Sequence, residues 1–233
     1  MKTIRIVIVL AVSTFIFCYS CIGQNANKND LTALNLKGKV KSISETYYKA
    51  IDTLGIVKKG VVTYKNLLHF DSKGNTEKFK KIMYNTIVDL DKKITYKYKY
   101  DSNGNLIEWD IFNLSKLDNK CVFNYDKDEN MIEEDCYNSK GKLFVSKKFT
   151  YDANGNMIEE NWYNSDNSLE SKINHKYDNN RNEIEQNSYN SDGTLLAKCT
   201  FTYEYDKISN WVTQTMFQNN IPLYIRVHQI TYY

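Results

Sequence analysis

Proline is nearly absent from this sequence, whereas tyrosine is abundant. A single proline, Pro222, stands among 233 residues that include 19 tyrosines. Disordered linkers are usually rich in proline, and tyrosine fits the half-buried surface of a sheet. The composition therefore favours β-strands over helices or disordered linkers.

Long hydrophobic runs and blocks of like charge are also missing. A transmembrane helix needs about 20 consecutive apolar residues, and no stretch after residue 20 approaches that length. The formal net charge is +3, falls to +1 without Lys2 and Arg5, and comes from charges that alternate in sign. We therefore expect no membrane span in the body of the chain and no nucleic-acid partner.

Cysteine is too sparse for a disulfide framework. Three cysteines follow the N-terminal segment, Cys121, Cys136 and Cys199, so at least one of them cannot pair within the chain. After the N-terminal segment, Cys-x-x-Cys pairs, Ser/His/Asp spacings and glycine-rich phosphate loops are missing too. The sequence therefore predicts no catalytic residue, no metal site and no cofactor.

The first residues have the form of an export signal. Lys2 and Arg5 make a short basic region, and residues 6–17 are almost entirely apolar. The apolar run is shorter than a membrane-spanning helix and leads into polar residues. We therefore expect residues 1–20 to be removed as a signal peptide.

The end of this segment resembles a lipoprotein signal. Ser20-Cys21 matches the close of the short box whose cysteine is acylated, so we predict lipidation at Cys21 with residues 21–30 as a flexible tether. Ordinary secretory cleavage nearby is the alternative. The protein is then expected at the outer membrane or cell surface as a lipoprotein, and otherwise in the periplasm or the medium.

One short motif recurs through most of the remaining chain. An aromatic-Asp pair returns at steps of 30, 25, 26, 26 and 28 residues, and asparagine always follows the aromatic by five residues. The pairs are Phe70-Asp71, Tyr100-Asp101, Tyr125-Asp126, Tyr151-Asp152, Tyr177-Asp178 and Tyr205-Asp206, with Asn75, Asn105, Asn130, Asn156, Asn182 and Asn210. Such a period is the signature of a repeat architecture.

The residues between Asp and Asn suit a hairpin turn. Asp caps a type I turn through its side chain, and glycine before the asparagine accepts positive φ without steric cost. We assign turn roles to Asp101, Gly104, Asn105, Asp126, Asn130, Asp152, Gly155, Asn156, Asp178, Asn182, Asp206 and Asn210. A second turn in each unit leaves strands of about six to eight residues.

The pairing register across each turn decides which side chains share a face. If Asp126 pairs with Asn130, the residue opposite Cys121 is Asp135, so Cys136 falls on the other face. We therefore predict free thiols, although a loop one residue longer would place the two cysteines directly across. Two adjacent apolar residues after the turn, as at residues 131–132, indicate either a bulge or two partly covered faces.

The segments on either side of the repeats complete the predicted fold. Residues 31–69 form an atypical β lead-in or cap, residues 70–233 hold six repeats, and residues 221–233 supply a closing strand. We predict an all-β protein: an antiparallel β-hairpin meander in a single curled or elongated sheet of roughly 12–14 strands.

The repeat resembles a known bacterial motif. Tyr-Asp-Ala-Asn-Gly-Asn-Met-Ile-Glu at residues 151–159 resembles the YD repeats of RHS-type surface and toxin proteins, over about residues 70–233, although Asn stands where Arg is typical. Residues 189–195 are similar to MORN-variant repeats, another β-hairpin array. The resemblance implies repeats that form extended β-sheets, with too few copies in this chain to enclose a toxin domain. It also implies a small repeat-containing lipoprotein.

Repeated carboxylates and histidines are the candidates for chemistry. Glu108, Glu133, Glu159 and Glu185 recur at one position, where a glycosidase role competes with pairing to lysines near Lys147, Lys172 and Lys198. General acid catalysis needs one carboxylate in a distinct environment, so we favour ion pairs. The Asp-x-Asn-x-Asn runs lack the ligands of a calcium loop. His69, His175 and His228 fall in predicted strands, where we expect them to be packed.

The tryptophans are the best candidates for binding. Trp109, Trp162 and Trp211 are either core residues of a thin sheet or an aromatic surface for a glycan or peptide. We predict a non-catalytic exported scaffold or binding module of the cell envelope, with a protein or glycan partner and membrane contact only through a lipid anchor. The alternatives are an envelope polysaccharide hydrolase and a toxin- or immunity-associated protein.

Overall fold

The computed structural model describes residue 31 and residues 34–83 and 94–233. The predicted signal peptide 1–20, the tether 21–30 and Cys21 lie outside the described residues. The described strands are β1 (Val40–Thr53), β2 (Ile56–Phe70), β3 (Thr76–Met83), β4 (Ile94–Tyr100), β5 (Leu106–Asn113), β6 (Lys116–Tyr125), β7 (Met131–Asn138), β8 (Leu143–Tyr151), β9 (Met157–Asn164), β10 (Leu169–Tyr177), β11 (Glu183–Asn190), β12 (Leu195–Tyr205), β13 (Trp211–Gln218) and β14 (Ile221–Tyr232).

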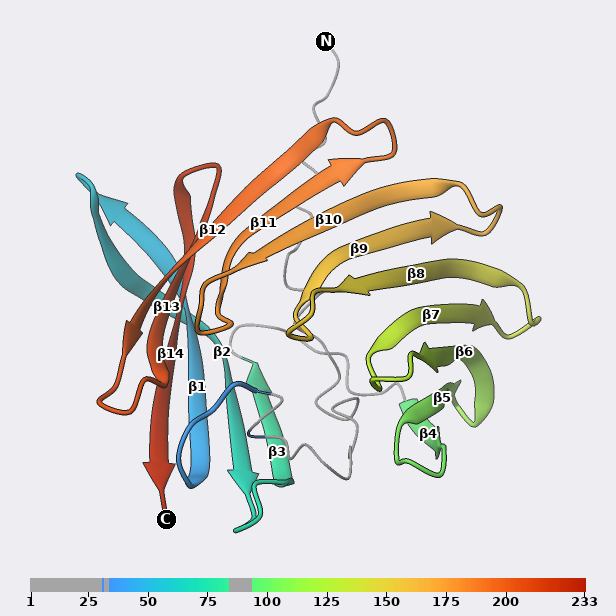
Figure 1. Cartoon of the computed structure of the whole chain (residues 1–233), viewed down its shortest axis with the longest axis horizontal. Helices are drawn as coiled ribbons and strands as arrows, with labels where there is room; N and C mark the ends of the chain where they lie inside the picture. The colour runs from blue at the N-terminus through green and yellow to red at the C-terminus, as the bar shows by residue number, and fades with distance from the viewer. Residues whose placement is uncertain (1–30, 32–33, 84–93) are drawn as a thin grey trace.

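These strands form one antiparallel sheet that curls on itself. Its order is β3-β2-β1-β14-β13-β12-β11-β10-β9-β8-β7-β6-β5-β4, so nearly every strand pairs with its sequence neighbours. Figure 1 shows the sheet bent into an arch with β3 and β4 at its two ends. The predicted all-β antiparallel meander is confirmed. Within the described residues, no helix is long and apolar enough to cross a bilayer.

One long-range pairing joins the lead-in to the end of the chain. β1 pairs with β14, with Glu45 opposite His228 and Tyr47 opposite Arg226. The hairpin of β1 and β2 therefore continues the sheet beyond the closing strand. Local sequence signals predicted both segments as strands, but they contained nothing that specified this pairing.

A side-chain carboxylate closes each turn between Asp and Asn. Asp152 Oδ1 accepts hydrogen bonds from the backbone N–H groups of Asn154 (2.8 Å) and Asn156 (2.9 Å), and the Asp152 N–H donates to the Asn156 carbonyl at 2.9 Å. The same three bonds recur at Asp71, Asp101, Asp126, Asp178 and Asp206. We call these six turns the Asp corners. The residue before the asparagine has positive φ in all six.

A bulge directly after the corner corrects the predicted state of two cysteines. Asp126 does pair with Asn130, but the register shifts by one residue between Asn124 and Tyr125. The residue opposite Cys121 is therefore Cys136, and the two form a disulfide. The prediction of free thiols is wrong for this pair, because it carried the turn register along the strand without the bulge. Cys199 is free and buried.

Tyrosine hydroxyls connect each of the last four repeats to the one before it. The hydroxyl donates to the carbonyl of the first residue in the neighbouring strand, beside the bulge. The bonds are Tyr125 to Leu106 (2.8 Å), Tyr151 to Met131 (2.7 Å), Tyr177 to Met157 (2.8 Å) and Tyr203 to Glu183 (2.6 Å). Where β12 is longer, Tyr203 makes this bond in place of Tyr205, because Tyr203 keeps the step of 26 residues from Tyr177.

The tyrosine bond predicts a measurable loss of stability in Tyr151→Phe. Removing the hydroxyl leaves the Met131 carbonyl without this donor, and we expect the free energy of unfolding to fall by about 1 kcal/mol. Urea denaturation followed by circular dichroism measures the change. Tyr163→Phe is the matched control, because in the described part of the chain the Tyr163 hydroxyl has no hydrogen-bond partner. Equal stabilities for the two variants would contradict the interpretation.

Candidate functional site on the inner face of the sheet

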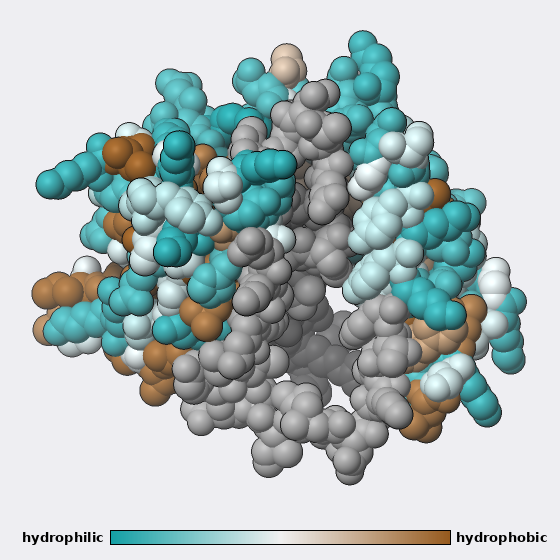
Figure 2. All heavy atoms as spheres, turned by 90° about the horizontal axis from the view of Figure 1, so that it is seen from below, coloured by the Kyte–Doolittle hydropathy of each residue, from teal (hydrophilic) through white to brown (hydrophobic). Residues whose placement is uncertain are grey.

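One face of the sheet carries most of the buried side chains. In a curled single layer, side chains on the concave side converge, whereas those on the convex side spread into solvent. We call the buried side the inner face. It holds three small apolar clusters but also an unusual number of buried polar residues, among them Glu45, Glu160, His175, Gln186 and Gln214. Figure 2 shows a largely hydrophilic exterior with scattered hydrophobic groups.

The repeats keep their corners constant but vary the residues that point inward. Nine residues after the repeat aromatic, the inner position holds Trp109, Glu134, Glu160, Gln186 and Gln214 in successive repeats. Two residues before the aromatic, it holds Tyr98, Phe123, Phe149, His175 and Tyr203. Because one fold forms around such different side chains, their chemistry is not required for folding, which makes the inner face the candidate site.

A buried ion cluster lies where the lead-in meets the closing strand. Glu45 is 1% exposed, and its carboxylate contacts Arg226 Nη2 at 2.6 Å, His228 Nε2 at 2.7 Å and Asn66 Nδ2 at 2.9 Å. Burial acts to raise the pKa of Glu45, but Arg226 and His228 hold that pKa well below its usual range. Removing one partner would leave a buried charge uncompensated, so this cluster specifies the β1–β14 register.

A chain of hydrogen bonds runs from this cluster across the inner face. Arg226 Nη1 donates to Gln214 at 3.0 Å, Gln214 Nε2 donates to the Tyr203 hydroxyl at 2.8 Å, and that hydroxyl donates to the Glu183 carbonyl. The Glu183 side chain in turn contacts His175 Nδ1 at 2.6 Å. The polar network therefore extends over neighbouring strands from β2 to β10.

The network is interrupted between β10 and β9. His175 Nε2, Glu160 Oε2 and Trp162 Nε1 are all buried, and in the described part of the molecule none makes a hydrogen bond of good geometry. The Trp162 N–H does lie near enough to the Glu160 carboxylate to act against the rise in its pKa. Glu160 is only 3% exposed, and burial raises its pKa against the opposing charges of Lys147 and His175. Buried polar atoms are almost always paired, so this group is a candidate place for a ligand group or an ordered water.

The network resumes on the other side of this gap. Lys147 Nζ lies 2.9 Å from Glu134 Oε2 and 4.3 Å from the centre of the Trp162 ring. A cation over an indole face is attracted by the ring quadrupole. The gap is therefore bordered by an acid, an imidazole, an indole and an ammonium group from β8, β9 and β10.

A surface pocket at the edge of the sheet that carries the Asp corners is also lined by His175. It has a volume of about 690 Å³, lies between the corners at Asp152 and Asp178, and has His175, Tyr177 and Arg181 among its lining residues. Arg181 also donates to Asn156 at 2.9 Å, which links the two corners. His175 therefore lines the pocket on one side and faces the gap in the network on the other.

The repeated glutamates occupy the opposite, outer face. Their ion pairs are Lys120–Glu108 (2.7 Å), Lys148–Glu133 (3.6 Å), Lys172–Glu159 (3.4 Å), and Lys176 and Lys198 with Glu185 (2.7 and 2.6 Å). Lys147, named in the sequence interpretation, pairs instead with Glu134 inside. These equivalent carboxylates therefore have structural partners, as the sequence interpretation favoured.

The other residues singled out from the sequence have different environments in the structure. Asp and Asn of the calcium-like runs are used by the corners themselves. His175 and His228 are buried, but His69 is exposed, so the prediction of a packed His69 is wrong. Its strand position alternates outward. Among the described residues, three potential metal ligands come together only at Cys121, Glu134 and Cys136, a set that sequence spacing did not reveal.

The three tryptophans share the inner face but do not form one surface. Trp109, Trp162 and Trp211 lie on β5, β9 and β13, four strands apart, or about 19 Å at the usual strand spacing. Trp109 stacks near Tyr98, while Trp211 stacks on His228 with ring centroids 3.5 Å apart. Only Trp162 borders the gap in the network.

Solved structures show similarity to this fold. A porin-like protein from Bacteroides vulgatus is 14% identical, with a TM-score of 0.51, over 84% of this chain and 99% of that one. A porin-like protein from Bacteroides uniformis is 10% identical, with a TM-score of 0.42, over 82% and 96%. The Photorhabdus luminescens Tc holotoxin pore is 17% identical, with a TM-score of 0.29, over 71% of this chain and 9% of that one. No protein-family model and no curated protein matches the chain.

These similarities concern the fold alone. At 14% identity, the Bacteroides vulgatus protein shows that a single curled β-sheet of this extent occurs in a solved structure. What the site can bind depends on this chain's own residues.

The unpaired carboxylate predicts that Glu160→Gln stabilises the protein. Because the folded-state pKa of Glu160 is raised, its contribution to stability is complete below the unfolded pKa and is lost as pH rises through the folded pKa. We expect the variant to gain about 1 kcal/mol at pH 7 and nothing near pH 4, measured by urea denaturation. Gln186 occupies the equivalent position in the next repeat, so the amide fits the fold.

The outer-face carboxylate next to it supplies the control. Glu159→Gln removes an exposed ion pair with Lys172, which contributes little, so we expect no gain at either pH. A loss of stability in Glu160→Gln at pH 7 would show that the carboxylate has a structural partner.

Proposed function

We propose that this chain is a non-catalytic binding module of the bacterial cell envelope that presents its inner face to a protein or glycan partner. The observation that supports this most strongly is the interruption between His175 and Glu160. A partner hydroxyl or amide can donate to Glu160 Oε2 and pair with His175 Nε2, while Trp162 offers an N–H donor and a ring for stacking.

The retention of an unpaired buried carboxylate supports a binding role over a purely structural one. Such a group costs stability, and proteins tolerate that cost where activity needs it. The neighbouring repeats show that a neutral amide or an indole can occupy the same position. Glu160 is therefore the residue whose chemistry the fold itself does not explain.

Export and a lipid anchor form the second part of the proposal. The basic and apolar N-terminal residues and Ser20-Cys21 support removal of residues 1–20 and acylation of Cys21. The Asp corners also support kinship with RHS-type YD repeats, since each repeat motif makes one turn and three of the six motif aromatics make an inter-repeat tyrosine bond.

Photocrosslinking in intact cells tests the proposed binding face. A photoreactive amino acid replaces Trp162 on the inner face or, as the control, Lys148, an exposed residue that pairs with Glu133 on the outer face. We expect a covalent adduct at position 162 that is absent at position 148. Digestion of the adduct with protease or glycosidase then identifies its class. Failure to form an adduct at 162, or equal adducts at both positions, contradicts the proposal.

A hydrolase of envelope polysaccharide is the second candidate. Glu160 and Glu183 are unlike carboxylates on either side of His175, since Glu183 is paired and Glu160 is not. Two carboxylates in different environments are the usual acid and base of such enzymes. New reducing ends released from purified peptidoglycan by wild type, but not by Glu160→Gln, would favour this candidate.

Metabolic labelling with a palmitate analogue tests the anchor. We expect label on the wild-type protein and none on Cys21→Ala, measured by in-gel fluorescence after immunoprecipitation. Cys199→Ala, which changes a buried thiol in the body of the sheet, is the control and should remain labelled. Unlabelled wild-type protein recovered from the medium would support simple secretion instead.

A further inference from the structure

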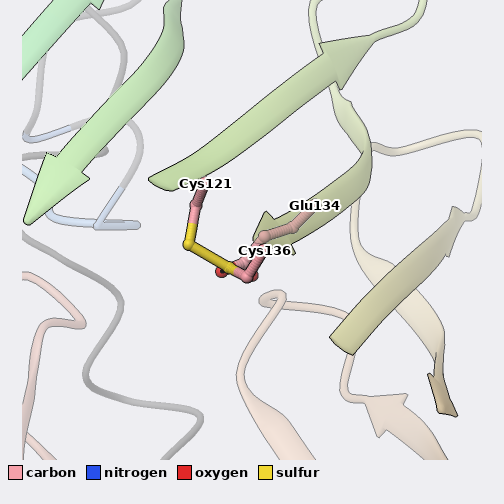
Figure 3. Close-up of side chains that lie close together, drawn as sticks. All are labelled: Cys121, Glu134 and Cys136. Carbon is pink, nitrogen blue, oxygen red and sulfur yellow. Dashed lines mark hydrogen bonds between the residues drawn. A yellow bond between two sulfur atoms is a disulfide. The ribbon is translucent and has the colours of Figure 1, made fainter. Parts of the chain in front are cut away.

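The disulfide lies in a group of three potential metal ligands. Cys121 on β6 and Cys136 on β7 are directly opposite, and Glu134 lies two residues before Cys136 on the same face. Glu134 Oε1 is 3.5 Å from Cys136 Sγ, and one ligand atom from each of the three residues lies within 4.8 Å of the others. Figure 3 shows the three side chains pointing to one side of the two strands.

We propose that reduction of the Cys121–Cys136 disulfide creates a Zn²⁺ site formed by the two thiolates and the Glu134 carboxylate. Zinc favours cysteine thiolates and accepts a carboxylate oxygen, with water completing a four-coordinate site. In the oxidised state, the S–S bond removes both thiolates, so the site exists only in the reduced state.

The surroundings suit such a site. Lys147 holds Glu134 Oε2 at 2.9 Å, which leaves Oε1 directed at the sulfur atoms. An outer partner of this kind fixes the orientation of a metal-binding carboxylate. Two thiolates and one carboxylate leave a single negative charge on a Zn²⁺ complex, and the Lys147 ammonium balances it. Both cysteines are 5% exposed, so this balance matters.

The cysteine pair is not a requirement of the repeat. The corresponding inner pairs in later repeats are Lys147 with Trp162, Ile173 with Ser188 and Phe201 with Met216. All belong to the same sheet with the same Asp corners. The pair of cysteines beside a carboxylate is therefore specific to one repeat, which supports a role other than holding the fold.

The chemical step balances with a dithiol reductant. Two thiol–disulfide exchanges transfer two electrons and two protons, so that the protein disulfide becomes two thiols while the dithiol becomes a cyclic disulfide. Zinc then displaces both thiol protons and binds the thiolates. Zinc affinity should therefore rise with pH in the reduced protein.

Zinc binding to the full chain tests the proposal. The protein is prepared in oxidised form and after reduction with dithiothreitol, the reductant is removed without oxygen, and ⁶⁵Zn²⁺ binding is measured by equilibrium dialysis. We expect one Zn²⁺ per reduced chain, bound at least about 100-fold more tightly than by the oxidised chain. The double variant Cys121→Ala/Cys136→Ala measures zinc held by other cysteines. It should lack the tight binding with or without dithiothreitol treatment.

Two neighbouring glutamates give a matched pair of variants. Glu134→Gln should weaken zinc binding by reduced protein by about tenfold or more, while Glu133→Gln, on the outer face, should leave it unchanged. Both keep the cysteines, and circular dichroism checks that they fold. Reduced wild type that binds zinc no more tightly than the double variant, or Glu134→Gln that binds like wild type, would overturn the proposal.

Discussion

The Asp corner is the interaction on which the rest of this structure depends. One carboxylate oxygen accepts hydrogen bonds from two backbone N–H groups within the turn itself. The corner therefore tolerates Glu129, Arg181 and Ser209 at a position of positive φ where glycine is cheapest. Because the Asp side chain shapes the turn locally, the strand residues do not have to specify it. They can therefore differ between repeats.

Within the described residues, a single curled layer has to bury its inner face without a second layer to cover it. The chain meets this constraint with tyrosines and polar networks in place of a continuous apolar core. Four tyrosines each reach the preceding strand and donate to a carbonyl beside the bulge, where the ladder is interrupted: Tyr125, Tyr151, Tyr177 and Tyr203. The ion cluster at Glu45 performs a similar role where the lead-in joins the closing strand. Polar contacts thus fix the register of the strands, and they also place polar side chains on the inner face.

Sequence reasoning succeeded where the signal was local. The spacing of Asp and Asn predicted the turns, the strand number and the antiparallel order, since each strand pairs mainly with its neighbours. It failed for contacts between distant residues: no local pattern could pair β1 with β14 or place Arg226 beside Glu45. It also missed Glu160 and His175 as a site, because each follows the repeat pattern and only their unpaired atoms distinguish them.

The bulge after each corner decides which chemistry faces inward. It turns Glu133 outward toward Lys148 and Glu134 inward toward Lys147. Without the extra residue, a shift of one position would exchange the two faces. The interior would then hold the uniform glutamates Glu108, Glu133, Glu159 and Glu185, and the varied set would be outside. One inserted residue per repeat therefore gives this array an inner face whose chemistry changes from strand to strand, which a binding site needs and a uniform ladder cannot supply.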